Sequence, residues 1–373
     1  MKNKKVLILY APFGAGHKTA AKAIEEAFKE KYPDVEAKNV DVLDFGFKIF
    51  RYSAPFIFDY INAKIPFLYK WIYNFYNHSS RYKFLNHASN LLIKKEEFIS
   101  FIKKFSPDFI LSTNPLPMQL VSKTKQKDIT DILSANVCTD FGFHSFWHNL
   151  DVNYYFVANE EIKKTLISHN VAPESIKVTG IPIGLKFGKK ADREKVLRDL
   201  NFSASRPVLL IVGVKITYKN LLKVIKGVKE KNNFVQFIVV AGRDKNLQKK
   251  LEKSEINNDP QIKVFGFVNN LDEYMGSADL VFTKPGGLTA SECLANGLPM
   301  IINDIMPGQE QDNVNYLVSH GSGIEAESIE EVIENIINLF NQSDKLKIME
   351  ENCLKIAKPN AAAELADFVN NLF

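Results

Sequence analysis

The sequence predicts two α/β domains, each built on a parallel sheet with helices on both faces. The chain has 373 residues, which is too long for one ordinary hydrophobic core. Short β-rich apolar runs alternate with helical patterns in both halves of the chain. Runs such as "VLLIVGV" and "FVQFIVVAG" are apolar throughout, as expected for strands that are buried on both faces. Two doubly wound domains account for all three observations.

The expected elements follow the chain in order. In the first half we predict strands at 5–10, 36–41, 109–113, 132–137 and 154–157. In the second half we predict strands at 207–213, 234–240, 262–265, 280–283 and 299–302. The segment "HKTAAKAIEEAFKEKY" predicts a helix, because its apolar positions 20, 24, 27 and 28 share a face.

We place the domain boundary near "VTGIPIGLKFG", where glycine and proline interrupt the pattern. The domains are then residues 1–180 and 181–355, and a last helix, 356–373, packs back on the first domain.

Composition excludes several classes of protein. The chain is 46% hydrophobic and 24% charged, and it has no low-complexity tract. No apolar run approaches the roughly 18 to 20 residues of a membrane-spanning helix. The start, "MKNKKVLILYAPFG", has a basic head, but its apolar part is only about six residues and reads as a first strand. The three cysteines are scattered, which predicts neither disulfides nor a zinc cluster. We therefore expect a cytoplasmic protein.

Residues 47–95 are basic and aromatic. They contain eight Lys or Arg against one acid, Asp59, and the stretch from Phe47 to Phe84 holds fourteen of the 43 aromatic residues. This mixture suits an anionic membrane surface, where aromatic rings lie at the depth of the headgroups. Two alternatives are a helical insertion whose aromatics form a core and a single-stranded nucleic-acid surface.

The first candidate site is the loop of "VLILYAPFGAGHKTAAKAIEEAF". Gly14 and Gly16 let a substrate approach the main chain, and the free N–H groups of the following helix favour negative charge. His17 stands at the turn, and imidazole is the side chain best suited to take a proton from a hydroxyl near pH 7. The loop matches neither the phosphate-binding loop GxxxxGK[ST] nor the full GxGxxG pattern. Packing or capping is the alternative role for His17.

The second candidate site begins where the strand at 280–283 ends in Pro285-Gly286-Gly287. A helix follows, so backbone amides and the helix dipole can hold an anion. Glu292 lies one turn into this helix and can direct its carboxylate to a vicinal diol such as ribose. After the next strand come four side chains that suit sugar hydroxyls: Gln309, Glu310, Gln311 and Asn313.

The third candidate site is "NVCTDFGFHSFWHNLDVNYYFVANE". Asp140, His144, Trp147 and His148 follow a predicted strand, and Asp140 could be a base or could orient one. Trp147 suits a sugar or lipid platform, or core packing. The chain has no DxD or HExxH motif, so we expect no metal site and no cofactor.

Four segments in register resemble the glycolipid branch of glycosyltransferase family 28: "APFGAGHKTAAKAI", "TDFGFHSFWHN", "VTGIPI" and "KPGGLTASECLANGLPMI…PGQEQDN". That branch contains monogalactosyldiacylglycerol synthase and the processive diacylglycerol glucosyltransferases. The resemblance implies the GT-B fold, with two doubly wound Rossmann-like domains that face each other across a cleft. It also implies inverting transfer from a UDP-sugar to diacylglycerol by a peripheral enzyme that needs no metal.

The resemblance also assigns roles to residues. It places Gly14, Ala15 and Gly16 beside the donor phosphates, and His17 at the acceptor hydroxyl. The donor would further be bound by Gly213, Val268 (at uracil, through its main chain), Gly286, Gly287, Leu288, Thr289, Glu292, Gln309 and Glu310. The stretch 47–95 corresponds to the family's membrane-docking region, and our candidates for acceptor or membrane contacts are His144, Trp147, Lys64, Trp71 and Tyr73.

One loop departs from the family. "IVGVKITYKN" keeps Gly213, but Ile216 stands where relatives have a second glycine, and Lys215 could supply a charge in its place. The predicted partners are a UDP-sugar and diacylglycerol in an anionic membrane on the inner face of the cell, with no nucleic acid. A sensor that binds UDP-sugar without transfer, and a transferase acting on a polyprenyl pyrophosphate, stay open as alternatives. The sequence does not distinguish glucose from galactose as the sugar, or His17 from Asp140 as the base. It also does not give the number of sugars added or the oligomeric state.

Overall fold

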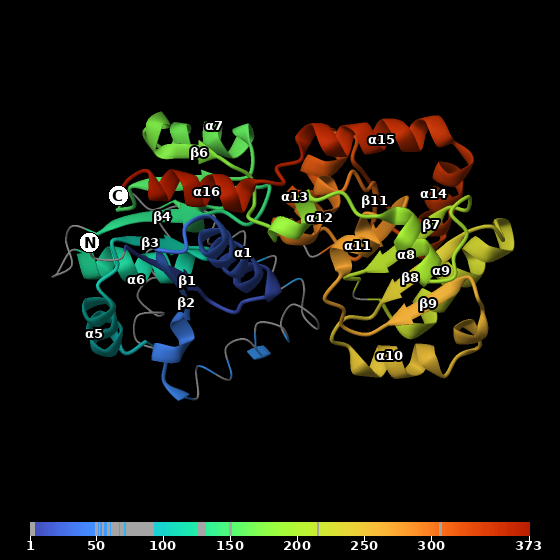
Figure 1. Cartoon of the computed structure of the whole chain (residues 1–373), viewed down its shortest axis with the longest axis horizontal. Helices are drawn as coiled ribbons and strands as arrows, with labels where there is room; N and C mark the ends of the chain where they lie inside the picture. The colour runs from blue at the N-terminus through green and yellow to red at the C-terminus, as the bar shows by residue number, and fades with distance from the viewer. Residues whose placement is uncertain are drawn as a thin grey trace. The chain divides into compact units, whose positions relative to one another are not determined.

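The computed structural model describes residues 4–48, 51, 53, 56, 57, 60, 67, 71, 93–125, 132–148, 151–214, 216–305 and 308–373. The chain divides into two compact units, whose elements are labelled in Figure 1. One unit comprises Met1–Leu185, Met306–Asp312 and Lys358–Phe373, and the other comprises Lys186–Ile305 and Asn313–Ala357.

The first unit is built on a six-stranded parallel sheet with the order β2-β1-β3-β4-β5-β6. Its strands are β1 (Lys5–Tyr10), β2 (Glu36–Asp41), β3 (Phe109–Ser112), β4 (Leu133–Val137), β5 (Tyr154–Val157) and β6 (Ile176–Val178). Its α-helices are α1 (Ala15–Lys31), α5 (Lys95–Phe105), α6 (Pro115–Lys125), α7 (Glu160–Ser168) and α16 (Ala361–Asn370).

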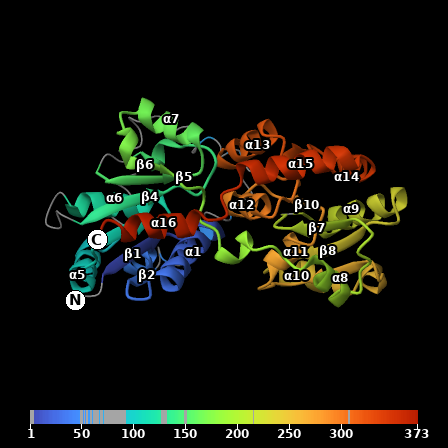
Figure 2. The ribbon, with the colours of Figure 1, turned by 45° about the horizontal axis from the view of Figure 1, so that its top comes forward.

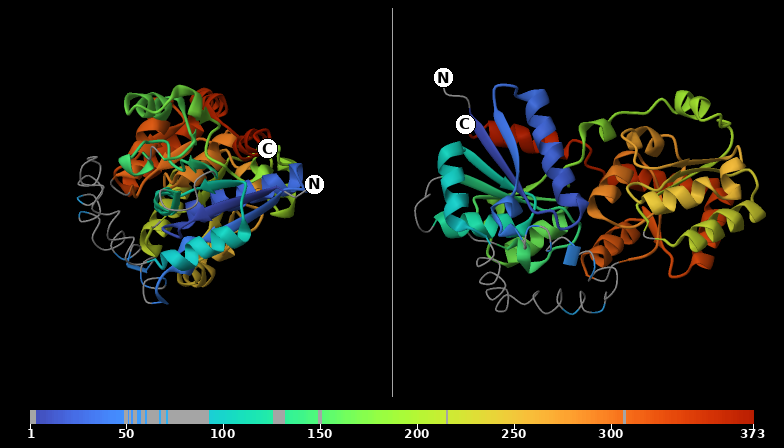
Figure 3. Two further views of the ribbon diagram at one scale, coloured as in Figure 1. Left: turned by 90° about the vertical axis from the view of Figure 1, so that its left-hand side faces the viewer. Right: turned by 90° about the horizontal axis from the view of Figure 1, so that it is seen from below.

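Helices cover both faces of this sheet because its central strand is buried on both. Along β1, Val6 and Ile8 belong to one hydrophobic cluster, with residues of α1 and α16. Leu7 and Leu9 belong to another, with residues of α5 and α6. Side chains alternate along a strand, so consecutive apolar residues serve opposite faces. The two helical layers can be followed in Figure 2 and Figure 3.

The chain returns to the first unit at its end, where α16 packs beside α1 (Figure 2). Asp367 joins the two helices: its carboxylate accepts from Lys31 Nζ at 2.6 Å and from the Tyr32 hydroxyl at 2.7 Å. Both contacts lie near the surface, where an ion pair contributes about 1 kcal/mol or less. The buried apolar residues Leu365 and Val369 therefore provide most of the stabilisation.

The second unit repeats this architecture with the strand order β12-β11-β10-β7-β8-β9, again parallel. Its strands are β7 (Val208–Val212), β8 (Gln236–Val240), β9 (Ile262–Phe265), β10 (Leu280–Thr283), β11 (Met300–Ile302) and β12 (Gly323–Glu325). Seven of its helices are α8 (Arg193–Asp199), α9 (Tyr218–Lys231), α10 (Lys245–Glu252), α11 (Leu271–Met275), α12 (Gly287–Ala295), α14 (Ile329–Asn341) and α15 (Ser343–Ile356). A further helix, α13 (Gln309–Ser319), begins in the residues assigned to the first unit and ends in the second.

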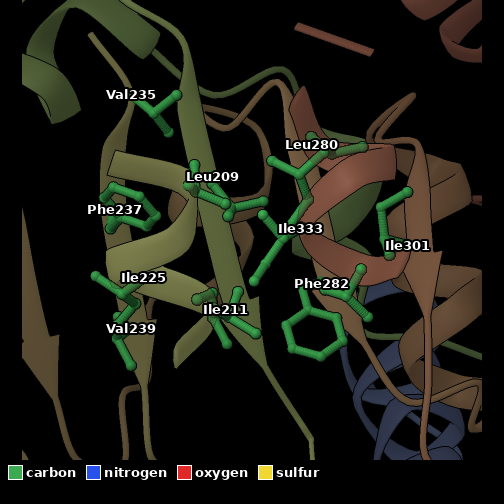
Figure 4. Packing of buried hydrophobic residues seen from close by; sticks show 14 of the residues in the cluster. Leu209, Ile211, Ile225, Val235, Phe237, Val239, Leu280, Phe282, Ile301 and Ile333 are labelled. Carbon is green, nitrogen blue, oxygen red and sulfur yellow. The ribbon is translucent and has the colours of Figure 1, made fainter. Parts of the chain in front are cut away.

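The core of the second unit is the cluster shown in Figure 4, in which strand residues meet α9 and α14. Leu209 and Ile211 of β7 point into it, beside Phe237 of β8 and Phe282 of β10. All four side chains are almost completely buried. Full burial of an apolar side chain of this size is worth about 2 kcal/mol.

All ten predicted strands are present, and the predicted doubly wound architecture is confirmed. Two strands are additional: β6 and β12, with three residues each at sheet edges. Unlike β11, which also has three residues but is apolar and buried throughout, they contain Lys177 or Glu325 and are only partly buried, so they lack the continuous apolar run that reveals a strand. Among the residues that the structure describes, no helix is both long enough and apolar enough to span a bilayer.

Candidate active site

The candidate site of the first unit lies where the strand order of its sheet reverses. The chain runs from β1 outward to β2, and then crosses back to β3 on the other side of β1. In doubly wound sheets, ligands bind at the carboxyl ends of the strands on either side of such a reversal. The loop after β1 leads to α1, and Thr113 follows β3 directly. The predicted loop of Gly14 and His17 therefore stands at this position.

Gly14 gives the loop its shape. It precedes α1 with φ 81°, in the left-handed region that favours glycine. No side chain accepts a hydrogen bond from the first amides of the helix. A Cβ added at Gly14 would meet nothing within 4 Å, which means that the space beside the backbone is open. The loop can thus accept a close ligand, as the sequence predicts.

His17 is held by two threonines. Its Nδ1 lies 2.6 Å from the carbonyl oxygen of Thr113 and 3.1 Å from Oγ1 of Thr139. A carbonyl oxygen can only accept, so Nδ1 carries the proton in the neutral ring and Nε2 carries the lone pair. No residue that the structure describes hydrogen-bonds Nε2. The ring is thus arranged as a proton acceptor.

The surroundings keep His17 neutral. Burial lowers the pKa of His17 to about 4, while the hydrogen bond to the carbonyl of Thr113 acts in the opposite direction. The indole of Trp147 lies beside the ring, with a distance of 6.4 Å between ring centroids. At pH 7 the imidazole is therefore uncharged and its Nε2 can accept a proton.

The third predicted segment contacts Nδ1 of this histidine through Thr139, and its four predicted site residues lie elsewhere. Trp147 is 4% exposed, and its carbonyl oxygen accepts from the Asn136 amide. His144 is also buried, and its Nδ1 accepts from the backbone N–H of Phe146 at 3.1 Å. Asp140 is buried just after β4. The structure thus brings Trp147 to His17, and it gives threonines rather than Asp140 as partners of Nδ1.

The second unit has a candidate site of its own, at the corresponding reversal of its sheet, between β7 and β10. Gly213 follows β7 with φ 71°, and a Cβ there would lie 3.4 Å from Oγ1 of Thr283, the last residue of β10. Gly286 is the N-cap of α12, without a side-chain cap. The amides at the start of α12 therefore lie in the turn after β10, where the sequence predicts that the diphosphate binds.

Glu292 lies inside the second unit. It is 8% exposed, and burial raises the pKa of this carboxyl to about 8; the Lys186 ammonium acts against the shift and the Asp272 carboxylate adds to it. Lys186 is fixed by an ion pair with Asp272 at 2.5 Å and by the carbonyl oxygen of Asn269. An uncharged Glu292 can donate as well as accept a hydrogen bond.

The other predicted residues occupy several places. Val268 follows β9, and Leu288 and Thr289 lie in the first turn of α12, where Leu288 is buried. Gln309 and Glu310 begin α13 and are assigned to the first unit. Lys64, Tyr73 and Lys215 lie outside the described residues. Trp71 is 54% exposed.

Ile216, the departure from the family pattern, has a structural use. Its side chain packs against the core cluster of the second unit. It also lines a cavity of about 350 Å³ at the carboxyl ends of β7, β11 and β12, together with Thr217, Asn220, Asn303 and Asp304. The described residues contain no group of three His, Cys, Asp or Glu side chains that could hold a metal ion.

Sequence reasoning missed Thr113 and Thr139. Thr113 directly follows β3, which neighbours β1 in the sheet, and Thr139 comes two residues after β4, the next strand in the sheet order. The signal in the sequence was the residue type at a strand end. Whether such a residue lies near His17 depends on the order of the strands in the sheet, which is known only from the fold.

Comparison with protein families identifies both halves of the chain. The model described as monogalactosyldiacylglycerol (MGDG) synthase matches residues 17–183. The model described as glycosyl transferases group 1 matches residues 192–355.

Curated relatives match along almost the whole chain. A processive diacylglycerol beta-glucosyltransferase of Bacillus cytotoxicus is 32% identical over an alignment of 380 positions. The alignment covers 99% of this chain and 94% of the relative. The enzyme of the same name from Bacillus subtilis is 29% identical, over 96% of this chain and 93% of its own.

Solved structures share the fold at low identity. The UDP complex of Staphylococcus aureus MnaA has a TM-score of 0.63 at 12% identity, covering 99% of this chain and 98% of that chain. MurG of Acinetobacter baumannii has a TM-score of 0.59 at 14% identity, covering 99% of both chains. The two Rossmann-like domains therefore form a GT-B fold. On the strength of the near full-length relatives, the chain belongs to the glycolipid branch of glycosyltransferase family 28.

Proposed function

We propose that this enzyme transfers glucose from UDP-glucose to diacylglycerol, with inversion at the anomeric carbon. The observation that carries the proposal is the 32% identity to a processive diacylglycerol beta-glucosyltransferase over 99% of this chain. The word beta in that name supports inversion, because an α-linked UDP-sugar gives a β-glycoside when the attacking hydroxyl enters from the opposite face.

His17 is the proposed general base. Its Nδ1 proton is engaged by Thr113, and its Nε2 has the lone pair needed to accept a proton. In the reaction, the acceptor oxygen forms a bond to C1 of the sugar while the bond from C1 to the β-phosphate oxygen breaks. UDP leaves, and the hydroxyl proton passes to Nε2. General bases contribute about 10²–10⁴ to such a step.

Asp140 is the alternative base. It is buried close to the end of β4, on the strand that also leads to Thr139. A carboxylate there could accept the same proton. The comparison of His17→Ala with Asp140→Asn separates the two, because only loss of the base should remove transfer while UDP binding persists.

The donor is proposed to bind in the second unit. The amides at Gly286 and Gly287 would hold the diphosphate, and Glu292 would bind the ribose hydroxyls. Gly213 leaves room beside the backbone after β7. Fixed amides and the dipole of α12 can stabilise the negative charge of the leaving UDP, and we propose that they do so without a metal ion or other cofactor.

The acceptor is proposed to come from a membrane surface. Phe56 and Phe67 are 71% and 79% exposed, and they lie in the basic and aromatic stretch 47–95. Exposed rings beside lysines and arginines suit the headgroup region of an anionic bilayer. We place the enzyme on the inner face of the cell membrane, bound peripherally.

The test is incubation of the protein with radiolabelled UDP-glucose or UDP-galactose and vesicles that contain diacylglycerol, followed by thin-layer chromatography. We expect label from UDP-glucose in a β-linked glucosyl lipid. A lipid product labelled only from UDP-galactose would identify UDP-galactose, and not UDP-glucose, as the donor. UDP binding without any lipid product would instead make the protein a sensor, and label in polyprenyl pyrophosphate would identify the peptidoglycan-type acceptor.

Loss of transfer in His17→Ala, with UDP affinity nearly unchanged, is expected if His17 is the base. Activity of His17→Ala within about threefold of the parent would refute that role, because a base should contribute at least about a hundredfold.

A further inference from the structure

Two oxygen atoms, from residues that follow β3 and β4, lie close to one ring nitrogen of His17. The carbonyl oxygen of Thr113 lies 2.6 Å from Nδ1, and Oγ1 of Thr139 lies 3.1 Å from the same atom. Since the carbonyl cannot donate, the Nδ1 proton points toward Thr113, and the hydroxyl of Thr139 is within reach as a second acceptor. Both contacts engage the side of the ring away from Nε2.

The two threonines are anchored in the sheet. Thr113 follows β3, and its N–H donates to the carbonyl of Leu9 in β1 at 3.1 Å. Its hydroxyl donates to the main-chain oxygen of His17 at 2.9 Å, so the same residue holds both the backbone and the ring of the histidine. Thr139 comes two residues after β4 and is 4% exposed. Neither anchor can move without disturbing a central strand.

We propose that Thr139 is a positioning residue for glycosyl transfer: its hydroxyl holds the orientation of the His17 ring, while the carbonyl of Thr113 keeps the proton on Nδ1 and leaves Nε2 open to the acceptor hydroxyl. The inference rests on the proposed function of His17 as base. The inference goes beyond that function because it assigns the orientation of the ring to a hydroxyl and a peptide carbonyl, whereas the sequence suggested Asp140.

The physical argument concerns the two tautomers of a neutral ring. If the proton moved to Nε2, the lone pair of Nδ1 would face the oxygen of Thr113, and the hydrogen bond would become a repulsion. A buried carbonyl that loses its donor is also left unsatisfied. The hydroxyl of Thr139 can accept from Nδ1–H or donate to a bare Nδ1, so it holds the orientation of the ring, and the carbonyl of Thr113 selects the tautomer. With Nε2 protonated the ring cannot accept the acceptor proton, so the tautomer preference feeds directly into kcat.

The first test compares three variants of the full-length enzyme in the vesicle assay. Thr139→Val keeps the shape of the side chain and removes the hydroxyl; we expect kcat to fall roughly two- to tenfold, the range for one neutral hydrogen bond, with the KM for UDP-glucose unchanged. Thr139→Ser restores the hydroxyl and should return kcat to within about twofold of the parent. Thr165→Val is the matched control, because its hydroxyl bonds only to Glu161 in α7, and it should behave like the parent.

The second test reads the tautomer directly and does not require activity. The protein is labelled with ¹⁵N-histidine, His17 is assigned with His17→Gln, and the two-bond proton–nitrogen correlations show which ring nitrogen carries the proton. We expect the Nδ1–H form in the parent, in Thr139→Ser and in Thr139→Val, because the carbonyl of Thr113 selects the tautomer in all three.

The outcomes separate this proposal from the proposed function. An Nε2–H ring in the parent protein overturns the positioning role, whatever the activity. Unchanged kcat in Thr139→Val overturns the part of Thr139. The expected tautomer pattern in a protein that makes no glycolipid would support the positioning of His17 and count against the transfer reaction instead.

Discussion

The side-chain amide of Asn313 donates to the carbonyl oxygen of Pro285 at 2.9 Å, inside the second unit. Asn313 has no exposed surface, so this hydrogen bond is shielded from water. It connects α13 with the turn that precedes α12, where the sequence predicts the diphosphate. The sequence suggested Asn313 as a partner for sugar hydroxyls, together with Gln309 and Glu310. Its amide nitrogen is instead used to hold the turn.

Replacing Asn313 with Ala should therefore destabilise the protein. The carbonyl of Pro285 loses its donor in a buried place, which costs about 1–3 kcal/mol. Asn313→Asp, which keeps the shape and loses the N–H groups, should be destabilised by a similar amount or more. The measurement is the midpoint of urea unfolding followed by circular dichroism. Asn246→Ala, on the exposed start of α10, is the control and should change stability by no more than about 0.5 kcal/mol. An Asn313→Ala protein as stable as this control would contradict the structural role.

This residue shows where prediction from sequence ends. Residue type identifies Asn313 as a good hydrogen-bonding group, but it does not say whether the amide points to a ligand or to the chain's own backbone. The strands were predictable, because runs such as Val208–Val212 are apolar throughout and can only be buried on both faces. The short edge strands β6 and β12 were not, since each is only partly buried and carries a charged residue in place of an uninterrupted apolar run.

The partners of His17 were equally hidden. Thr113 is 96 residues away along the chain and Thr139 is 122 residues away. Their approach depends on β1, β3 and β4 being neighbours in the sheet, which follows from topology and not from any local pattern. Gly14, by contrast, was legible, because a glycine between a buried strand and a helix has few other uses.

His17 should remain neutral well below neutral pH. Burial lowers the pKa of His17 to about 4, so the ring takes up no proton as the pH falls from 8 to 6. With the unperturbed pKa of about 6.5, about three quarters of the rings would be charged at pH 6. We expect an NMR titration of the ¹⁵N-labelled ring to show no midpoint above pH 5. Exposed His169 in the same sample provides the comparison. A midpoint of His17 near 6.5 would contradict the burial that the structure shows.

Glu292 should make the protein less stable as the pH rises. Burial raises the pKa of this carboxyl to about 8 in the folded state, whereas the unfolded chain has its ordinary value of about 4.5. The group therefore contributes its full stability below pH 4.5, and the contribution is lost as the pH rises through 8, at about 1.4 kcal/mol for each unit of pKa difference. Glu292→Gln has no charge to bury.

The measurement is the difference in unfolding free energy between Glu292→Gln and the parent at pH 5 and at pH 9. We expect this difference to shift in favour of the variant by at least about 1 kcal/mol at the higher pH. Glu327→Gln, on the surface of the same unit, should show no such shift. A difference that is the same at both pH values would mean that Glu292 is already ionised in the folded protein.

Phe67 should anchor the protein to vesicles. Its side chain is 79% exposed, in the basic stretch 47–95, and an aromatic ring that leaves water for the bilayer gains about 2 kcal/mol. Phe67→Ser should therefore bind vesicles of anionic lipid about thirtyfold more weakly in a sedimentation assay. Phe234→Ser is the matched control, because Phe234 is 64% exposed but lies in the second unit, between α9 and β8. Salt tests the basic residues separately, since raising it from 0.1 M to 1 M shortens the screening length from about 10 Å to 3 Å. Equal binding by the two serine variants would remove the stretch 47–95 from the membrane contact, and binding that ignores both lipid charge and salt would exclude its lysines and arginines from the attraction.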